Sequence, residues 1–304
     1  MSGRILIDQQ QLAAVANGDL KFLSRLDKRG LIPAVNETAP EFAQRLERLE
    51  NALQELEKNL QQSVDYEPAP GIMISGKNRI PRPIINEALR LTGELYDVQP
   101  DWVPGFFANE KNGALWGGCA LSDPASNLTL FIIRKIFRRQ QKFLVYDRRE
   151  LTAHELTHAA HQHVDEWLFE EYFAYQTARS KLRRFFGSCF IGKYDALLFL
   201  LPILLLPVVQ MLNILGIILL PMWIFWVAAA IYPIYLLRRC WYIALIMRKA
   251  RSFLLRNHVQ KPDAVLFRMT VQEIQSLAAG VMPQGNDLRW QLINQRLEEG
   301  AKTL

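Results

Sequence analysis

The feature that most constrains the fold of this chain is an apolar block of 42 residues, 196–237, without a single Asp, Glu, Lys, Arg or His. As one helix the block would measure about 63 Å, twice the roughly 30 Å of hydrocarbon in a bilayer. It therefore predicts a hairpin of two transmembrane helices that turns at its amide-bearing residues, Gln210–Asn213. The alternatives are a shallower re-entrant hairpin and a buried core of a soluble protein.

Basic residues lie close to both ends of this block. Five precede it and five follow it: Arg179, Lys181, Arg183, Arg184 and Lys193, then Arg238, Arg239, Arg248, Lys249 and Arg251. Because Lys and Arg gather on the cytoplasmic side of spanning helices, we expect an integral protein of a bacterial inner membrane or its equivalent, with both termini cytoplasmic. Anionic headgroups also account for the net charge of +6, and no nucleic-acid-binding motif accompanies that charge.

The remainder of the 304 residues has the composition of a charged, water-soluble protein. We place the expected domain boundaries at a Pro- and Gly-rich stretch over 66–83 and at the apolar block. We expect an N-terminal helical region over 1–65, a linker over 66–84, a mixed domain over 85–190, the hairpin over 191–240 and a cytoplasmic helical region over 241–304.

The N-terminal region contains a short heptad pattern. Leucines recur at spacings of three and four from Leu46 to Leu60, and Phe42 stands one step before them. The pattern predicts an amphipathic helix whose apolar face packs on its own domain or against a second copy. Self-association through residues 42–60 is therefore one expectation.

The three cysteines, Cys119, Cys189 and Cys240, are far apart in the sequence and form no CxxC pair. This pattern predicts no disulfide framework and is typical of a reducing compartment. The first ten residues, MSGRILIDQQ, contain no apolar run that could serve as a signal peptide.

Strand and helix signals follow one another in the mixed domain. A helix is expected over 85–96, and then three β-branched and aromatic segments predict strands between Ala114 and Tyr146: GALWGGCALS, LTLFIIRKIF and KFLVY. Helices are expected over 149–164 and 166–184. Beyond the apolar block, Thr270 and Glu273 form a candidate capping box, and LRWQLINQRLEEG predicts a helix near the end of the chain.

The helix expected over 149–164 contains His154-Glu155-Leu156-Thr157-His158, an HExxH motif. Residues four apart lie one above the other on a helix, so the two imidazoles can chelate one ion. Glu155, next along the helix, can take a proton from a water that the metal activates.

The helix that follows supplies a third ligand. Glu171 stands 13 residues beyond His158 and completes a set of two histidines and one glutamate, which leaves a fourth position for water as in catalytic zinc sites. Glu170 is the alternative third ligand on helical phase. We expect His161 near the ligands but not among them, and His163 at the surface.

With these residues, the segment over 113–180 resembles the gluzincin metallopeptidases, in which HExxH is followed by a Glu-x-x-Ala helix. The resemblance implies Zn²⁺ bound by His154, His158 and Glu171, with Glu155 as general base. It also implies a zincin-like fold whose antiparallel sheet presents an edge strand, here GALWGGCALS, to an extended peptide.

The chain departs from the gluzincin pattern at one position. Many gluzincins have an aspartate four residues after the glutamate ligand, where this chain has Tyr175. The carboxylate that orients the first histidine is then missing or comes from elsewhere, such as Asp165. Tyr172 or Tyr175 could donate a hydrogen bond to the oxyanion of the reaction, or either could be a packing residue.

The sequence therefore predicts an α+β protein with an N-terminal helical region, a zincin-like metallopeptidase domain and a two-helix transmembrane hairpin. The expected activity is zinc-dependent hydrolysis of peptide bonds in protein substrates at the cytoplasmic membrane face. The metal-binding helix is too polar to lie in lipid, unlike that of intramembrane proteases. The alternatives are a zinc-binding pseudo-protease without turnover and a membrane scaffold that recruits a partner.

Overall fold

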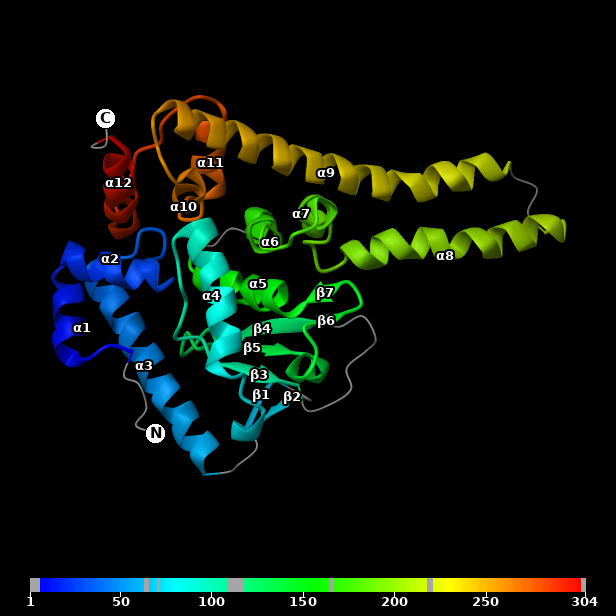
Figure 1. The fold of residues 1–304 in the computed structure, drawn as a ribbon. Helices are drawn as coiled ribbons and strands as arrows, with labels where there is room; N and C mark the ends of the chain where they lie inside the picture. Colours follow the sequence, from blue (N-terminus) through cyan, green and yellow to red (C-terminus); the bar gives the residue numbers. More distant parts are fainter. Residues whose placement is uncertain are drawn as a thin grey trace.

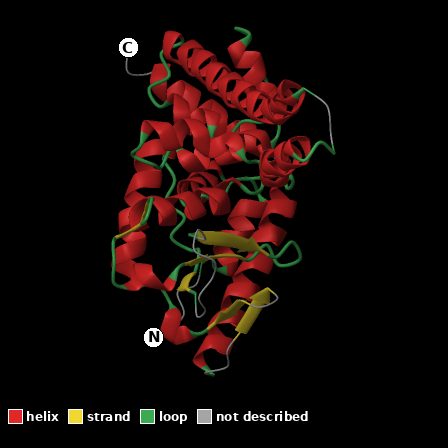
Figure 2. Cartoon of the chain, turned by 90° about the vertical axis from the view of Figure 1, so that its right-hand side faces the viewer, coloured by secondary structure: helices red, strands yellow, loops and turns green. Residues whose placement is uncertain are grey.

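Two long helices project side by side from the body of the molecule (Figure 1). The strands gather in the lower part of that body, and most of the helices lie above them (Figure 2). The computed structural model describes residues 6–62, 66–69, 72–108, 117–164, 167–217 and 221–301. The mixed α+β class expected from the sequence is confirmed.

The N-terminal region is helical, as predicted. It contains α1 (Gln9–Ala16), α2 (Leu20–Lys28) and α3 (Ala39–Gln61). A capping box formed by Thr38 and Glu41 starts α3, because the two side chains satisfy N–H groups that the first turn leaves unpaired. The apolar seam of α3 from Phe42 to Leu60 lies inside the chain's own core. Of the two expectations for this seam, the structure shows packing on the chain's own domain, and self-association through residues 42–60 stays a prediction.

The stretch expected as a linker is ordered in its described part. Strands β1 (Tyr66–Ala69) and β2 (Ile72–Ile74) pair antiparallel, and the 3-10 helix η1 (Gly76–Asn78) follows them. Next comes α4 (Arg82–Tyr96), which starts three residues before the expected position because Pro81 and Pro83 fit the first turn of a helix.

The central sheet has the order β3-β5-β4, formed by β3 (Gly105–Phe107), β4 (Gly118–Ser122) and β5 (Thr129–Ile133). The expectation of an antiparallel sheet is wrong for one pair, since β3 runs parallel to β5. Strand β4, which comes between these two in the sequence, runs antiparallel to β5, and β5 lies in the middle of the sheet, so β3 and β5 run in the same direction. Strand β4 lies at an edge, as expected; residues 113–116 of GALWGGCALS are outside the described part.

The other two expected strands are shorter than the sequence indicated. The segment LTLFIIRKIF forms strand β5 only as far as Ile133, and its last residues belong to the 3-10 helix η2 (Lys135–Arg138). The strand ends where basic residues follow the β-branched and aromatic ones. KFLVY becomes a tight hairpin of β6 (Lys142–Phe143) and β7 (Tyr146–Asp147).

The helices of the metal motif follow this hairpin. The first, α5 (Arg148–His161), is capped by Asp147, which accepts hydrogen bonds from two N–H groups of the first turn. The single helix expected over 166–184 is instead α6 (Trp167–Tyr175) and α7 (Lys181–Phe186). The break has a local cause, because Thr177 bonds back to the Ala174 carbonyl while Ser180 caps the start of α7. The short 3-10 helix η3 (Gly187–Cys189) comes next.

The apolar block forms α8 (Asp195–Ile214) and the first half of α9 (Met222–Arg256). Both are long and apolar enough to cross a membrane, and only 6% of the apolar window of α8 is buried in the body, which disfavours a soluble core helix. The turn expected at Gln210–Asn213 lies further along the chain. Gly216, in the left-handed region, follows the end of α8, and Pro221 caps α9.

The second half of α9 packs into the body, so the boundary expected at residue 240 falls inside one continuous helix. Beyond it lie α10 (Pro262–Leu266), α11 (Val271–Ala278) and α12 (Leu288–Ala301). The predicted capping box of Thr270 and Glu273 is present at α11. Two of the free cysteines, Cys189 of η3 and Cys240 of α9, are in contact, which their separation in sequence concealed.

A buried ion pair joins the C-terminal helices to the N-terminal ones. The Arg268 guanidinium donates to Asp27 at the end of α2 with an Nε–Oδ1 distance of 2.6 Å, and both side chains are 1% exposed or less. Arg296 of α12 binds the same carboxylate. The regions before and after the apolar helices therefore form one body.

Candidate metal centre

The predicted ligands converge between α5 and α6. His154 and His158 project from one face of α5, with 3.2 Å between their Nε2 atoms. Glu171 of α6 faces both of them, at 3.9 Å from His154 Nε2 and 3.6 Å from His158 Nε2. The side chains of the histidines are 16% exposed and that of Glu171 is 28% exposed, so the cluster is sheltered but reachable from solvent.

The spacing of these atoms fits a zinc ion. Bonds of about 2.0–2.1 Å in tetrahedral geometry place ligand atoms roughly 3.3–3.5 Å apart. The two Nε2 atoms are 3.2 Å apart, close to that value. Glu171 approaches them with different oxygens, Oε1 at 3.6 Å from His158 and Oε2 at 3.9 Å from His154, and one atom from each of the three residues lies within 4.8 Å of the other two. Two nitrogens and one carboxylate oxygen also form a donor set that zinc favours, and they leave a fourth position for water or substrate.

Each histidine is held by a partner on the side away from the cluster. His158 Nδ1 lies 2.7 Å from Glu170 Oε1, and the main-chain carbonyl of Ala174 accepts a hydrogen bond from the His154 ring. Partners of this kind fix the orientation of a ligating imidazole. Glu170, the alternative third ligand, therefore contacts the Nδ1 side of His158 in this structure. Asp165, suggested for that task, lies outside the described residues.

Glu155 lies on the other side of the cluster, against the edge strand β4. Its side chain is buried, and its carboxylate accepts a hydrogen bond from the Ala120 N–H. A side chain at Gly118 would come within 3.5 Å of the same carboxylate. Burial, with the nearby Glu171, raises the pKa of Glu155 to about 7 although His158 opposes the shift. A carboxyl with that pKa can both accept and return a proton near neutral pH.

Burial acts on the pKa of each of the three clustered residues. Burial, with His158 as neighbour, lowers the pKa of His154 well below its usual value. Burial alone would also lower the pKa of His158. Its hydrogen bond to Glu170 and the charge of Glu171 outweigh burial and raise the pKa of His158 to about 9. Burial also raises the pKa of Glu171. The three groups share one sheltered site, the environment in which perturbed pKa values mark functional candidates.

The two remaining histidines of the segment take no part in the cluster. His161 is fully buried between the rings of Phe173 and Phe267, at centroid distances of 5.2 and 4.9 Å. Its Nε2 has no hydrogen-bond partner among the described residues. His163, expected at the surface, is partly exposed, and its Nε2 lies 2.9 Å from Nε2 of Gln162.

The two candidate tyrosines differ in their surroundings. The Tyr175 ring packs edge-on against His154 with 4.7 Å between ring centroids, and Gly187 of η3 lies against its other side. Tyr172 packs with Phe173 in the apolar core that α6 shares with α9 and the C-terminal helices. Of the two, Tyr175 is the one beside the ligands.

Several contacts of the site had no signal in the sequence. Gln162, just past α5, accepts hydrogen bonds from Ser122 of β4 and Thr129 of β5 and so fastens the metal helix to the sheet. The main-chain groups of Ala120 and Ala174 also contribute, and such groups are set by backbone position rather than by residue type.

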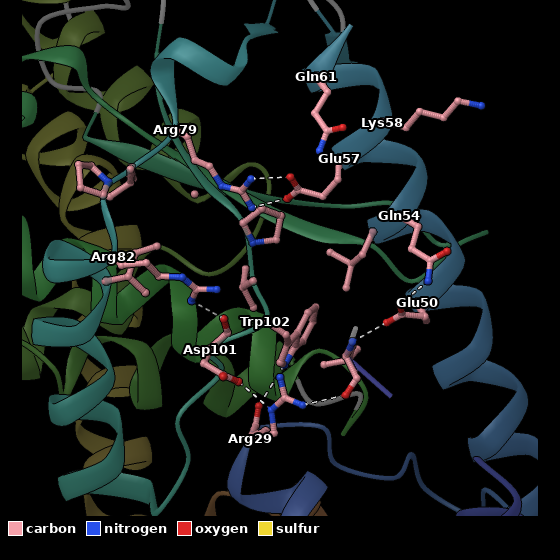
Figure 3. A pocket seen from close by; sticks show the side chains of 18 residues that line it. Arg29, Glu50, Gln54, Glu57, Lys58, Gln61, Arg79, Arg82, Asp101 and Trp102 are labelled. Carbon is pink, nitrogen blue, oxygen red and sulfur yellow. Dashed lines mark hydrogen bonds and ion pairs between the residues drawn. The ribbon is translucent and has the colours of Figure 1, made fainter. Parts of the chain in front are cut away.

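A cavity of about 690 Å³ lies elsewhere, between α3, the start of α4 and the chain before β3 (Figure 3). It shares no residue with the metal cluster. Figure 3 shows two ion pairs among its charged groups, Arg29 with Asp101 and Arg79 with Glu57. This pairing favours a structural role over binding of a charged ligand.

Comparison of the chain with protein-family models, with curated proteins and with solved structures gives no match in any of the three. The resemblance to gluzincins therefore rests on the residues of the motif alone.

Proposed function

We propose that this protein is a membrane-anchored zinc-dependent metallopeptidase that cleaves peptide bonds of protein substrates at the cytoplasmic face. The observation that supports this most is the cluster of His154, His158 and Glu171 at ligand spacing, with the buried Glu155 carboxylate beside it. A purely structural zinc site needs no such base, and its fourth position is filled by protein.

In this proposal each residue has one task. His154, His158 and Glu171 hold Zn²⁺, and Glu170 orients His158. When bound, zinc lowers the pKa of a water molecule and polarises a carbonyl. Glu155 takes the proton of the attacking water and delivers it to the leaving amine, a task for which its buried carboxylate beside the cluster is placed. Strand β4, at the sheet edge next to Glu155, is the proposed place for an extended peptide.

The location belongs to the same proposal. The helices α8 and α9 anchor the chain, and the metal cluster lies in the body rather than between them (Figure 1). Basic residues flank both ends of the hairpin, which supports the cytoplasmic side for the body and both termini.

Replacement of Glu155 by Gln tests the proposed reaction. The amide keeps the shape of the side chain but cannot accept the proton, so hydrolysis should fall by about 10²-fold or more. Zinc content of the purified protein should stay at one ion per chain, and His154→Ala should lose it.

Membrane proteomes of cells that carry wild type or Glu155→Gln would reveal the substrates as proteins cleaved only by wild type. Wild-type turnover in Glu155→Gln would exclude Glu155 as the base, and wild-type protein without zinc would end the enzyme proposal.

A further inference from the structure

An apolar surface on the body borders the projecting helices. It consists of Leu144 and Val145 at the tip of the β6–β7 hairpin and of Leu182 and Phe186 on α7, and we call it the hairpin–α7 surface. The exposed fractions of the four residues are 65%, 68%, 69% and 44%. The hairpin lies on the side of the body from which α8 and α9 project (Figure 1). An exposed group of four large apolar side chains is typical of a surface that binds a partner or a membrane.

The conformation of the hairpin tip indicates a function rather than a folding requirement. Leu144 and Val145 form a two-residue loop, and Leu144 has a φ of 51°. Such loops favour Gly, Asn or Asp at positions of positive φ, because a branched side chain is strained there. Leu144 bears that strain while exposed, so its side chain adds little to the core.

Arg183 holds this surface together. Its guanidinium donates to the Val145 carbonyl at 3.1 Å, lies 5.6 Å from the centre of the Tyr146 ring and forms an ion pair with Glu150 at 2.8 Å. Since Glu150 belongs to the first turn of α5, the hairpin, α7 and the metal helix are one connected unit.

The surroundings of the surface match a bilayer. Phe190 and Tyr194, both exposed, continue the apolar surface toward α8, and the Phe190 ring contacts Phe199 at 5.5 Å. Between 134 and 194, no acidic residue in the described part is exposed. Eight basic residues in the same range are exposed: Lys135, Arg138, Arg139, Lys142, Arg179, Lys181, Arg184 and Lys193. Apolar side chains fringed by cations are the pattern of a surface that enters the interface of an anionic membrane.

We propose that the hairpin–α7 surface inserts into the cytoplasmic leaflet as a second membrane contact beside the two helices. This inference rests on the membrane anchoring in the proposed function. The α5 helix starts directly after β7, and His154 lies six residues beyond Arg148, which corresponds to about 9 Å along the helix. Insertion of the hairpin therefore fixes the metal centre close above the lipid, where it meets peptide bonds next to a membrane surface.

Photo-crosslinking of the full-length protein tests this contact. The probe p-benzoylphenylalanine replaces one residue at a time in protein reconstituted into vesicles of phosphatidylcholine and phosphatidylglycerol in equal amounts. Val145 tests the proposed surface. Leu204, 66% exposed on α8, reports the anchor, and Val281, 60% exposed between α11 and α12, is the matched control on the body. Mass spectrometry identifies the adducts.

We expect phospholipid adducts at position 145 in a yield comparable with that at 204, and none at 281. Adducts at 204 alone would overturn the hairpin contact and leave the anchor standing. A lack of lipid adducts at both 204 and 145 would overturn the anchor and this inference together. Adducts between two chains at 145 in place of lipid, or lipid adducts equally strong at 281, would also overturn it.

Discussion

Adjacent carboxylates on α6 differ in role because a helix turns by about 100° per residue. Glu171 faces the Nε2 atoms of both histidines, whereas Glu170 holds Nδ1 of His158 at 2.7 Å. Glu170→Gln should weaken zinc affinity about 10–100-fold, the usual effect of losing an orienting partner. Glu171→Gln should weaken it further, because a ligand itself is replaced. Zinc titrations against a chelator of known affinity measure both, and the reverse order would make Glu170 the ligand.

At the same scale, His161 makes stability depend on pH. Burial lowers the pKa of His161 from 6.5 to about 4, so the unfolded chain binds more protons than the folded chain between those values. The stabilisation is complete above pH 6.5 and is lost as the pH falls toward 4, an effect on the order of 3 kcal/mol. Thermal unfolding in detergent should therefore show a larger drop from pH 7 to pH 5 for wild type than for His161→Leu. Equal drops would mean that His161 is hydrated or paired.

At the scale of elements, Gly187 controls how closely η3 approaches α6. A Cβ atom at this position would lie 2.0 Å from Cγ of Tyr175, whose ring packs against His154 on its other side. Gly187→Ala should therefore cost about 1–3 kcal/mol, the usual effect of overpacking, and lower the unfolding midpoint. Lys181→Ala, at an exposed position of α7, is the matched control and should leave the midpoint unchanged. An unchanged midpoint in Gly187→Ala would show that the Tyr175 ring moves aside freely.

At the scale of the whole molecule, the buried pair of Asp27 and Arg268 restricts the topology. Residues 241 apart, on either side of the apolar helices, share one core and must lie on the same side of a bilayer. The number of spans is therefore even if the helices cross the membrane. A cysteine at Asn257, exposed at the end of α9, should resist a membrane-impermeant thiol reagent in intact cells and react after permeabilisation. The wild-type chain, whose Cys189 and Cys240 are buried, gives the background. Labelling of residue 257 in intact cells would place the body outside.

The sequence by itself determined the features that depend on local spacing. An HExxH motif on a helix places His154 and His158 side by side whatever surrounds them, and the length of the uncharged block sets two apolar helices. Caps such as Thr270 with Glu273 are local in the same way. These predictions hold because each depends on residues a few positions apart along the chain.

Tertiary structure decided what depends on separate segments meeting. The different contacts of Glu170 and Glu171 with the histidines of α5, the hydrogen bond from the Ala120 N–H to Glu155 and the parallel pairing of β3 with β5 all join separate elements. A main-chain N–H group such as that of Ala120 can belong to any residue type, so the sequence does not reveal it. Glu170 and Glu171 are adjacent in the sequence, so helical spacing alone did not decide which of them faces the histidines. The same holds for the buried ion pair of Asp27 and Arg268, which joins the N-terminal and C-terminal helices. A buried charge is stable only beside a partner of opposite charge, and only the folded chain brings these two residues together.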